Sequence, residues 1–150
     1  MRPQRAQPDW EMSYRPRLTP MLAWAAAVLI MAVGVAIALT LRLESTGPTL
    51  RAADQVAMVG IAGVLAGVAL LLTRPRIKAG PSGLAVRNIL GWREIPWGEV
   101  VDFSFPPGKR WARVELDYDE YLPVLAIHSN DRERAVAAME AVRGLMNRYR

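Results

Sequence analysis

Two long apolar runs in the first half of the chain constrain its fold more than any other feature. Met21–Leu41 holds no charged residue across 21 positions, and Val56–Leu72 holds none across 17. A helix needs about 20 apolar residues to cross a bilayer, within a range of roughly 17 to 25. Only 14 residues separate the two runs. The pattern therefore predicts a transmembrane hairpin of two helices over residues 21–73.

Basic residues at the outer ends of the runs predict how the hairpin is oriented. The N-terminal segment, residues 1–20, carries Arg2, Arg5, Arg15 and Arg17, and the second run is followed by Arg74, Arg76 and Lys78. The connecting segment sets Arg42 and Arg51 against Glu44 and Asp54. Lys and Arg accumulate on the cytoplasmic side of membrane spans. We therefore expect a multi-pass protein of the cytoplasmic membrane, with both termini cytoplasmic.

The first run has an alternative interpretation as a cleaved signal peptide. Ala36-Ile37-Ala38 matches an A-x-A cleavage site after a basic flank. The apolar run continues beyond this site, however, whereas the apolar core of a signal peptide spans about 7 to 15 residues. The length of the run favours a retained transmembrane helix.

The second run contains a stripe of small residues. Gly63 and Gly67 form a G-x-x-x-G pair, and Gly60, Ala62 and Ala66 widen this small surface. Small residues at this spacing let two membrane helices approach closely. The first run offers small residues of its own as a partner: Ala26, Gly34 and Ala38. The stripe has two interpretations: packing against the first helix of the same hairpin, or docking of another membrane protein.

Several classes of site are excluded by what the sequence lacks. The chain has no cysteine, which rules out disulfides, thiolate metal sites and cysteine nucleophiles. His128 is the one histidine and has no partner placed for catalysis by sequence. No phosphate-binding loop, dinucleotide fingerprint or nucleophile elbow occurs. We therefore expect no enzyme, no cofactor and no metal site.

The charge pattern excludes a nucleic-acid partner. The net charge is +5, but the 13 basic and 10 acidic residues of 74–150 are intermixed. Nucleic-acid-binding domains gather their basic residues on one face or stripe.

A small soluble domain is expected over residues 79–150. Ala79–Gly83 is a cluster of chain breakers that predicts a short linker. Five short strands follow at roughly ten-residue spacing, which is typical of an antiparallel sandwich or barrel. Their apolar positions are Leu84 and Val86; Ile95 and Trp97; Val101, Phe103 and Phe105; Ala112, Val114 and Leu116; and Tyr121–Ile127, in which Pro123 indicates an edge strand or bulge.

The C-terminal end of the chain predicts one amphipathic helix. Asn130 is a good N-cap, and Glu133 three residues later would complete a capping box. The apolar positions recur at helical spacing: Val136, Met139, Val142, Met146 and Tyr149. Such a stripe typically covers a sheet or closes the end of a barrel.

Strands followed by one C-terminal helix resemble a pleckstrin-homology (PH) fold, and the resemblance becomes specific at residues 93–103. The run R-E-I-P-W-G-E-V-V-D-F resembles the R-x-I-P-W-x-E-V motif of bacterial PH-like domains. Residues 110–116 and 121–127 resemble further blocks of an actinobacterial family of PH-domain proteins and low-molecular-weight antigens. Its members often carry two preceding membrane helices. The resemblance implies a membrane hairpin followed by an α+β PH-like domain, and it implies no particular activity.

The motif residues also have a physical interpretation as scaffold. Pro96 fixes the backbone φ at a strand end, and Trp97 supplies a large buried side chain to a small core. Glu99 would satisfy a nearby backbone or arginine group. We expect a structural role for the whole set: Arg93, Ile95, Pro96, Trp97, Glu99 and Trp111.

Candidate contacts to phosphate or anionic lipid come from basic residues at turns and flanks. The resemblance points to the first hairpin loop, but Arg87 and Arg93 flank only Asn88–Gly91, which is too short and apolar to hold a charged headgroup. The better candidates are Lys109 and Arg110, together with the flanking Arg74, Arg76 and Lys78.

The acidic turn after residue 116 completes the candidate sites. Asp117, Asp119 and Glu120 lack the spacing of a calcium loop, so a solvated turn is expected. Tyr118 and Tyr121 beside them could contact a partner. We expect a non-enzymatic, membrane-anchored module that binds a protein or serves as an accessory subunit, with sensing of anionic lipid or a small ligand as the alternative.

Overall fold

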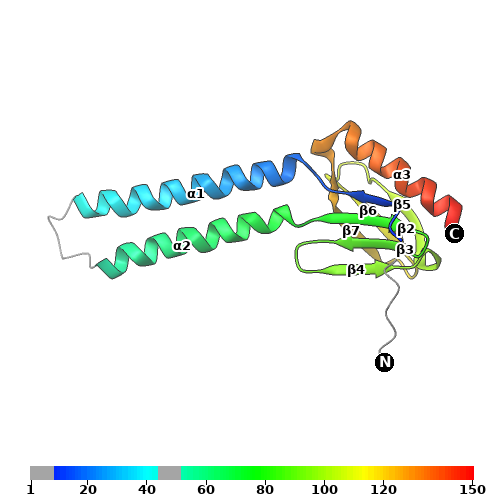
Figure 1. Cartoon of the computed structure of the whole chain (residues 1–150), viewed down its shortest axis with the longest axis horizontal. Coiled ribbons are helices and arrows are strands. Elements are labelled where there is room, and N and C mark those ends of the chain that lie inside the picture. Colours follow the sequence, from blue (N-terminus) through cyan, green and yellow to red (C-terminus); the bar gives the residue numbers. More distant parts are fainter. Residues whose placement is uncertain (1–8, 44–51) are drawn as a thin grey trace, which may run out of the picture. The chain divides into compact units, whose positions relative to one another are not determined.

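The computed structural model describes residues 9–43 and 52–150 (Figure 1). They fall into two compact units. One unit contains the residues up to Leu18 together with Arg74–Arg150, and the other is Thr19–Thr73. Of the expected orienting residues, Arg2, Arg5, Glu44, Arg51 and the side chain of Arg42 lie outside the described part of the chain.

The helical unit consists of α1 (Leu18–Leu43), α2 (Ala52–Leu70) and a short 3₁₀ turn, η1 (Leu71–Thr73). Both helices are long and apolar enough to cross a membrane, with mean hydropathies of 2.6 and 2.4. Large apolar side chains are exposed along both helices, including Leu29 and Val64. Helices that are apolar all round belong in a membrane or a large core. The expectation of two membrane-length helices is therefore confirmed.

Packing inside the hairpin uses small residues other than the predicted pair. A Cβ added at Gly34 of α1 would overlap the Cβ of Ala62 on α2, and Ala62 and Ala66 are buried. Among the described residues, no atom lies within 4 Å of a Cβ added at Gly60, Gly63 or Gly67. The glycine stripe therefore does not contact α1, and docking of another helix on it stays a proposal.

The second unit consists of two antiparallel sheets and one long helix. Sheet A has the order β1 (Met12–Tyr14), β2 (Arg76–Gly80), β3 (Gly83–Arg87) and β4 (Trp92–Ile95). Sheet B has the order β5 (Val100–Ser104), β6 (Trp111–Leu116) and β7 (Tyr121–His128). Two 3₁₀ turns, η2 (Trp97–Glu99) and η3 (Ser129–Asp131), precede β5 and α3 (Glu133–Tyr149). The predicted α+β PH-like fold is confirmed.

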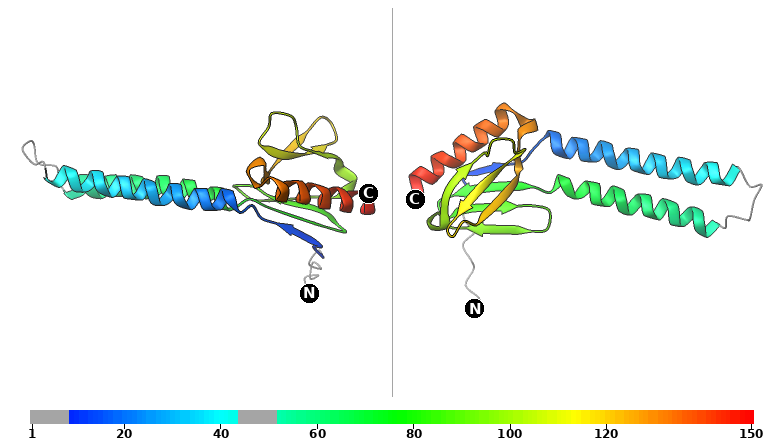
Figure 2. Two further views of the ribbon diagram at one scale, coloured as in Figure 1. Left: turned by 90° about the horizontal axis from the view of Figure 1, so that it is seen from above. Right: turned by 180° about the vertical axis from the view of Figure 1, so that it is seen from behind.

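The core lies between the sheets and α3, which lies beside both of them (Figure 2). Ala112 and Val114 alternate with Arg113 and Glu115 along β6, as the sequence predicts, and only the apolar pair is fully buried. Successive side chains of a strand point to opposite faces, so one face of β6 enters the core.

The five predicted strands are present as β3 to β7, but the linker predicted at Ala79–Gly83 is wrong, and two further strands were missed. Arg76–Gly80 forms β2, and the breaker residues make a tight hairpin into β3. Gly83 has a φ of 136°, and a Cβ there would overlap the carbonyl oxygen of Ile95. Met12–Tyr14 pairs with β2 as β1, so the hairpin of α1 and α2 is inserted between two neighbouring strands of sheet A (Figure 1).

Three local predictions also differ from the structure. Val101 is exposed because a bulge between Val100 and Asp102 turns Val100 and Phe103 inward instead. Asn130 lies in η3, so α3 begins at Glu133 after Arg132 without the expected capping box. Val136 is 57% exposed, because the buried stripe of α3 runs through Ala135, Ala138 and Val142.

Pro123 lies in an edge strand, as predicted. β7 pairs only with β6, and the Asn88 side chain covers its other edge. The Asn88 amide donates to the carbonyl oxygen of Pro123 at 2.8 Å and accepts from the backbone N–H of Leu125 at 3.3 Å. The backbone carbonyl and ring nitrogen of Pro123 therefore point away from β6. The missing N–H of proline then costs no hydrogen bond between the two strands.

Candidate functional site

Asp131 joins the two chain segments that flank the inserted hairpin. Its carboxylate accepts the Tyr14 hydroxyl at 3.0 Å and the backbone N–H of Leu18, the first residue of α1, at 3.3 Å. Burial raises the pKa of Tyr14 to about 12, and the hydrogen bond to Asp131 adds to the rise. The Arg134 guanidinium lies 5.4 Å from the Tyr14 ring. This cluster holds β1 against the start of α3.

The predicted motif residues lie where sheet A meets sheet B. Trp97 is 4% exposed, and its indole Nε1 donates to the carbonyl oxygen of Gly80 at 2.8 Å. Pro96 has a φ of −65° at the start of η2, and the Glu99 N–H closes that turn on the Pro96 carbonyl at 3.0 Å. Ile95 is buried, whereas the Glu99 side chain is exposed.

Two further motif residues lie at the surface. The Arg93 guanidinium is 3.8 Å from the Glu120 carboxylate, and both side chains are largely exposed. Such a pair contributes little to stability, typically under about 1 kcal/mol. Trp111 packs its ring 6.5 Å from that of His128. These contacts link residues at or near the ends of strands.

A groove between α3 and the segment after β5 has a volume of about 580 Å³. Its walls combine apolar and charged side chains. They are Phe105, Ala135, Val136 and Met139 on the apolar side, with Ser129, Arg132, Glu140 and Arg143 at the rim. Sequence reasoning missed this groove. It placed Val136 on the buried stripe of the helix, whereas Val136 is exposed and lines the groove.

Hydrogen bonds hold the groove in shape. Arg143 Nε donates to the carbonyl oxygen of Phe103 at 3.1 Å, and the Arg150 guanidinium donates to that of Val101 at 3.1 Å. Both bonds satisfy carbonyls on the free edge of β5 and so block pairing with another strand. These two carbonyls are therefore not free to pair with an added strand.

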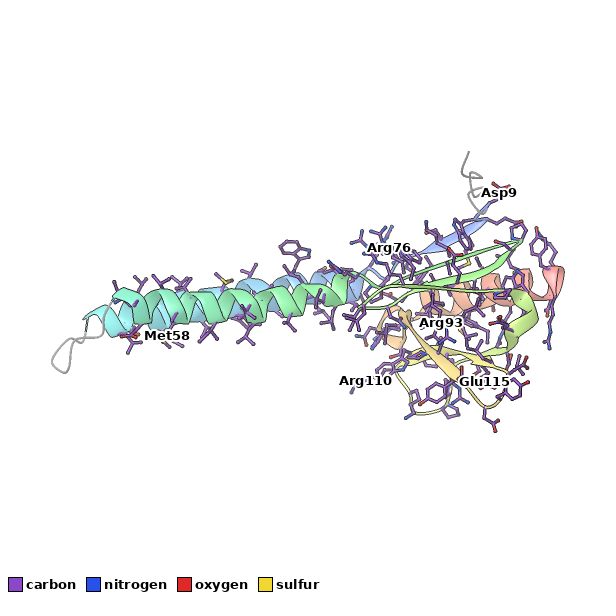
Figure 3. All side chains as sticks on the ribbon, turned by 90° about the horizontal axis from the view of Figure 1, so that it is seen from below. Asp9, Met58, Arg76, Arg93, Arg110 and Glu115 are labelled. Atoms are coloured by element: carbon purple, nitrogen blue, oxygen red, sulfur yellow. The ribbon has the colours of Figure 1, made fainter. Side chains whose placement is uncertain are left out.

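The predicted basic residues divide into two groups. Arg76 and Lys78 lie on β2, following Arg74, and their side chains alternate with the buried Ile77 and Ala79. Lys109 and Arg110 lie in the connection between β5 and β6 and are exposed. Figure 3 shows Arg76 and Arg110 toward one end of this unit, with Asp9 and Glu115 toward the other.

The structure adds an aromatic residue to the β2 group. Lys78 Nζ lies 5.3 Å, and the Arg87 guanidinium carbon 5.7 Å, from the centre of the Trp92 ring. Sequence reasoning missed Trp92 because only the register of three strands brings it beside Lys78. The sequence signal that could have indicated Trp92 as a surface residue was its position directly after the chain breaker Gly91.

A hydrogen-bond network lies on β5 and β6, just before the acidic turn. The Arg113 Nε donates to Glu115 at 2.9 Å, and the Ser104 hydroxyl donates to the same oxygen at 3.0 Å. The bond from Arg113 lowers the pKa of Glu115. Over the described ranges, no group of three or more metal-binding side chains is found. Tyr118 and Asp119 adopt positive φ at the tip of this turn, and Tyr118 and Tyr121 are exposed.

His128 is used for local structure. Its Nδ1 accepts the backbone N–H of Asn130 at 3.1 Å, which starts η3. Burial lowers the pKa of His128, and the nearby Arg110 lowers it further. The residue is therefore neutral at pH 7, as accepting this bond requires.

Comparison with known proteins agrees with this architecture. The family described as "Bacterial PH domain" matches residues 74–145. Three mycobacterial proteins, one from Mycobacterium bovis and two from strains of Mycobacterium tuberculosis, are each 52% identical over 142 residues, which is 95% of this chain and 92% of theirs. Each is named only as an uncharacterized protein. No solved structure matches. The chain thus belongs to an actinobacterial family of PH-domain proteins with two membrane-length helices.

Proposed function

We propose that this protein is a non-enzymatic interaction module of the cytoplasmic membrane. Its two helices cross the bilayer with both termini cytoplasmic, and its PH-like domain binds a segment of another membrane or membrane-associated protein. The observation that carries the proposal is the groove between α3 and the segment after β5. The orientation is supported by the basic flanks at Arg15, Arg17 and Arg74.

The groove favours a peptide segment with one bulky apolar side chain and a neighbouring acidic residue. Phe105, Val136 and Met139 form an apolar wall, and Val136 is 57% exposed to water. Covering such a wall with an apolar side chain is favourable. Arg132 and Arg143 at the rim match a carboxylate in charge, and Glu140 favours a segment without further acidic residues.

Anchorage makes a weak contact sufficient. Two sites held on one surface by short linkers meet at an effective concentration of roughly millimolar. A groove of this size then gives useful occupancy without the tight binding of a deep pocket. This reasoning supports an accessory subunit that stays near its partner.

The partner proposal is tested by a pair of exposed positions on α3. Val136→Glu places a charge in the apolar wall, whereas Asn147→Glu adds the same charge at an exposed position outside the groove. We expect a stoichiometric partner in mild-detergent extracts of native membranes, lost with Val136→Glu and retained with Asn147→Glu. A photoreactive residue at position 136 should cross-link to an acidic, apolar segment of that partner.

Two results would overturn the proposal. The first is recovery of the wild-type protein alone from native membranes. The second is a partner that Val136→Glu and Asn147→Glu leave equally bound. The proposed orientation has its own test. A reporter that works only in the cytoplasm should be active when fused after Arg150, and a reporter that works only outside the cytoplasm should be inactive there.

A further inference from the structure

The loop between β3 and β4 exposes apolar residues that the fold does not cover. Leu90, at the tip of this loop, is 96% exposed, and Trp92 at the start of β4 is 44% exposed. The loop itself is held firmly, because the Asn88 N–H donates to the Gly91 carbonyl at 3.2 Å and the Asn88 side chain is fixed on β7. A rigid loop thus presents a leucine and a tryptophan to whatever lies outside it.

Cations surround the tryptophan on the outer face of sheet A. Lys78 and Arg87 both approach the Trp92 ring, at 5.3 and 5.7 Å. Arg76 pairs with Arg87 in register and lies on the same face. Its buried Nε has no hydrogen-bond partner among the described residues. Glu94 is the acidic residue on this face of β4, opposite Ala85, so the face remains basic overall.

The strand register places this surface at the end of sheet A where the chain connects to the hairpin. Tyr14 pairs with Ile77, Arg76 with Arg87, and Arg87 with Trp92. Arg76 comes three residues after Thr73, a distance of at most about 11 Å along an extended chain. Neighbouring strands are about 5 Å apart, so Arg87 and Trp92 lie within roughly a further 10 Å.

We propose that this end of sheet A is a docking surface for an anionic lipid bilayer. The lipid-docking surface consists of Arg76, Lys78, Arg87, Leu90 and Trp92. Leu90 enters the region between headgroups and acyl chains, Trp92 lies at the headgroup level, and the three cations contact lipid phosphates. Leucine favours the apolar side of this boundary, and tryptophan is enriched at membrane interfaces. Charge complementarity and the short covalent connection both favour lipid over another occupant.

The inference rests on the proposed membrane anchorage but not on the groove along α3. It also gives the loop between β3 and β4 a role other than holding a headgroup. Asn88–Gly91 is too short and apolar to enclose a headgroup, but those properties suit a loop that inserts into a bilayer surface.

A fluorescent label tests the insertion directly in the full chain. The protein has no cysteine, so Leu90→Cys gives one attachment site for an environment-sensitive dye. Tyr118→Cys is the matched control, because Tyr118 is 98% exposed at the tip of another turn. In nanodiscs of phosphatidylglycerol and phosphatidylcholine, we expect a blue-shifted label quenched by brominated lipid at position 90, and a solvent-exposed, unquenched label at position 118.

Charge reversal tests the role of the cations. Each basic residue near an anionic surface contributes about fivefold to association, so Lys78→Glu with Arg87→Glu should lower the ratio of inserted to free loop by roughly 25-fold or more. Arg148→Glu with Arg150→Glu makes the same charge change at the C-terminal end of α3 and should leave the label at position 90 unchanged. Nanodiscs of phosphatidylcholine alone should show weaker insertion than anionic ones.

Several outcomes would overturn the lipid assignment. One is equal solvent exposure of the labels at positions 90 and 118 in anionic nanodiscs. Another is a label at position 90 that is shielded in native membranes but exposed in nanodiscs, which would identify a protein on this face. Loss of the α3 partner with Val136→Glu does not affect the label, so failures of the two proposals can be told apart.

Discussion

The hydroxyl group of Tyr14 donates a hydrogen bond to the Asp131 carboxylate at 3.0 Å, across 117 positions of the chain. Tyr14 ends the strand that precedes the hairpin, and Asp131 lies in the turn that starts α3. The pair therefore joins two parts of the PH-like domain that are separated in the sequence by two membrane-length helices. The bond is a buried polar contact that adds to the pairing of β1 with β2.

Removing the acceptor of this bond should destabilise the domain. Asp131→Ala leaves the buried Tyr14 hydroxyl and the Leu18 N–H without their partner, and an unsatisfied buried group costs about 1–3 kcal/mol. We expect a loss of this size in the free energy of unfolding, measured by tryptophan fluorescence of the full chain in mild detergent. Tyr14→Phe should cost less, and adding it to Asp131→Ala should cost less than the sum. Strict additivity would show that the two residues are not coupled.

Alkaline pH should weaken the same contact. The pKa of Tyr14 rises from 10.0 to about 12 on folding, so the folded state holds the proton more tightly than the unfolded state. This contribution is complete below pH 10 and is lost as the pH rises to about 12; it amounts to at most about 2–3 kcal/mol, and solvent screening lowers it further. Tyr14→Phe should remove it, so the variant should lose less stability than the wild type between pH 9.5 and 12. Parallel pH profiles for the two proteins would contradict this.

The buried indole of Trp97 should matter far more than the exposed one of Trp92. Trp97→Phe removes the donor to the Gly80 carbonyl and leaves a cavity, which together cost about 2–4 kcal/mol. Trp92→Phe, at a partly exposed site, should change the unfolding free energy by about 0.5 kcal/mol or less. Thermal unfolding of both variants gives the comparison, and equal effects would be inconsistent with the role of Trp97 in the core.

Glycine at position 34 should be needed for close approach of the two helices. Gly34→Ala places a methyl group onto Ala62, and overpacking costs about 1–3 kcal/mol. Adding Ala62→Gly should restore the packing, since the methyl group then changes sides. Helix separation, measured between labels on α1 and α2 during titration with a harsh detergent, reports the effect. Gly63→Ala is the control and should be neutral within the hairpin, because no described atom lies within 4 Å of its Cβ position.

The domain should fold without its anchor only when β1 is retained. A chain that joins the residues up to Leu18 to Arg74–Arg150 through a flexible linker keeps sheet A complete and should be folded in solution. A chain of residues 79–150 lacks β1 and most of β2, which leaves β3 at the edge with Val86 uncovered. We expect that shorter chain to aggregate or to give an unfolded spectrum. Equal stability of the two chains would show that β1 is dispensable.

The helices, the alternating strands and the PH-like motif were all predictable from local pattern. Uncharged runs of membrane length, the alternation in Ala112–Leu116 and the motif around Pro96-Trp97 each depend on residues close together in the chain. Periodicity also located α3, although its first residue and its buried face were shifted. The shifted start accompanies hydrogen bonds from Tyr14 and Leu18, which are distant in sequence, to Asp131 in η3.

What the sequence alone determined is therefore the presence of two membrane-length apolar helices in the first half and the class of fold in the second. Only the tertiary structure decided that Met12–Tyr14 is a strand, because three residues with no pattern of their own become a strand only by pairing with β2. It also decided that Lys78 and Arg87 both approach the Trp92 ring, and that Val136 lines a groove. These features depend on register and packing between distant segments, and local propensity carries no information about them.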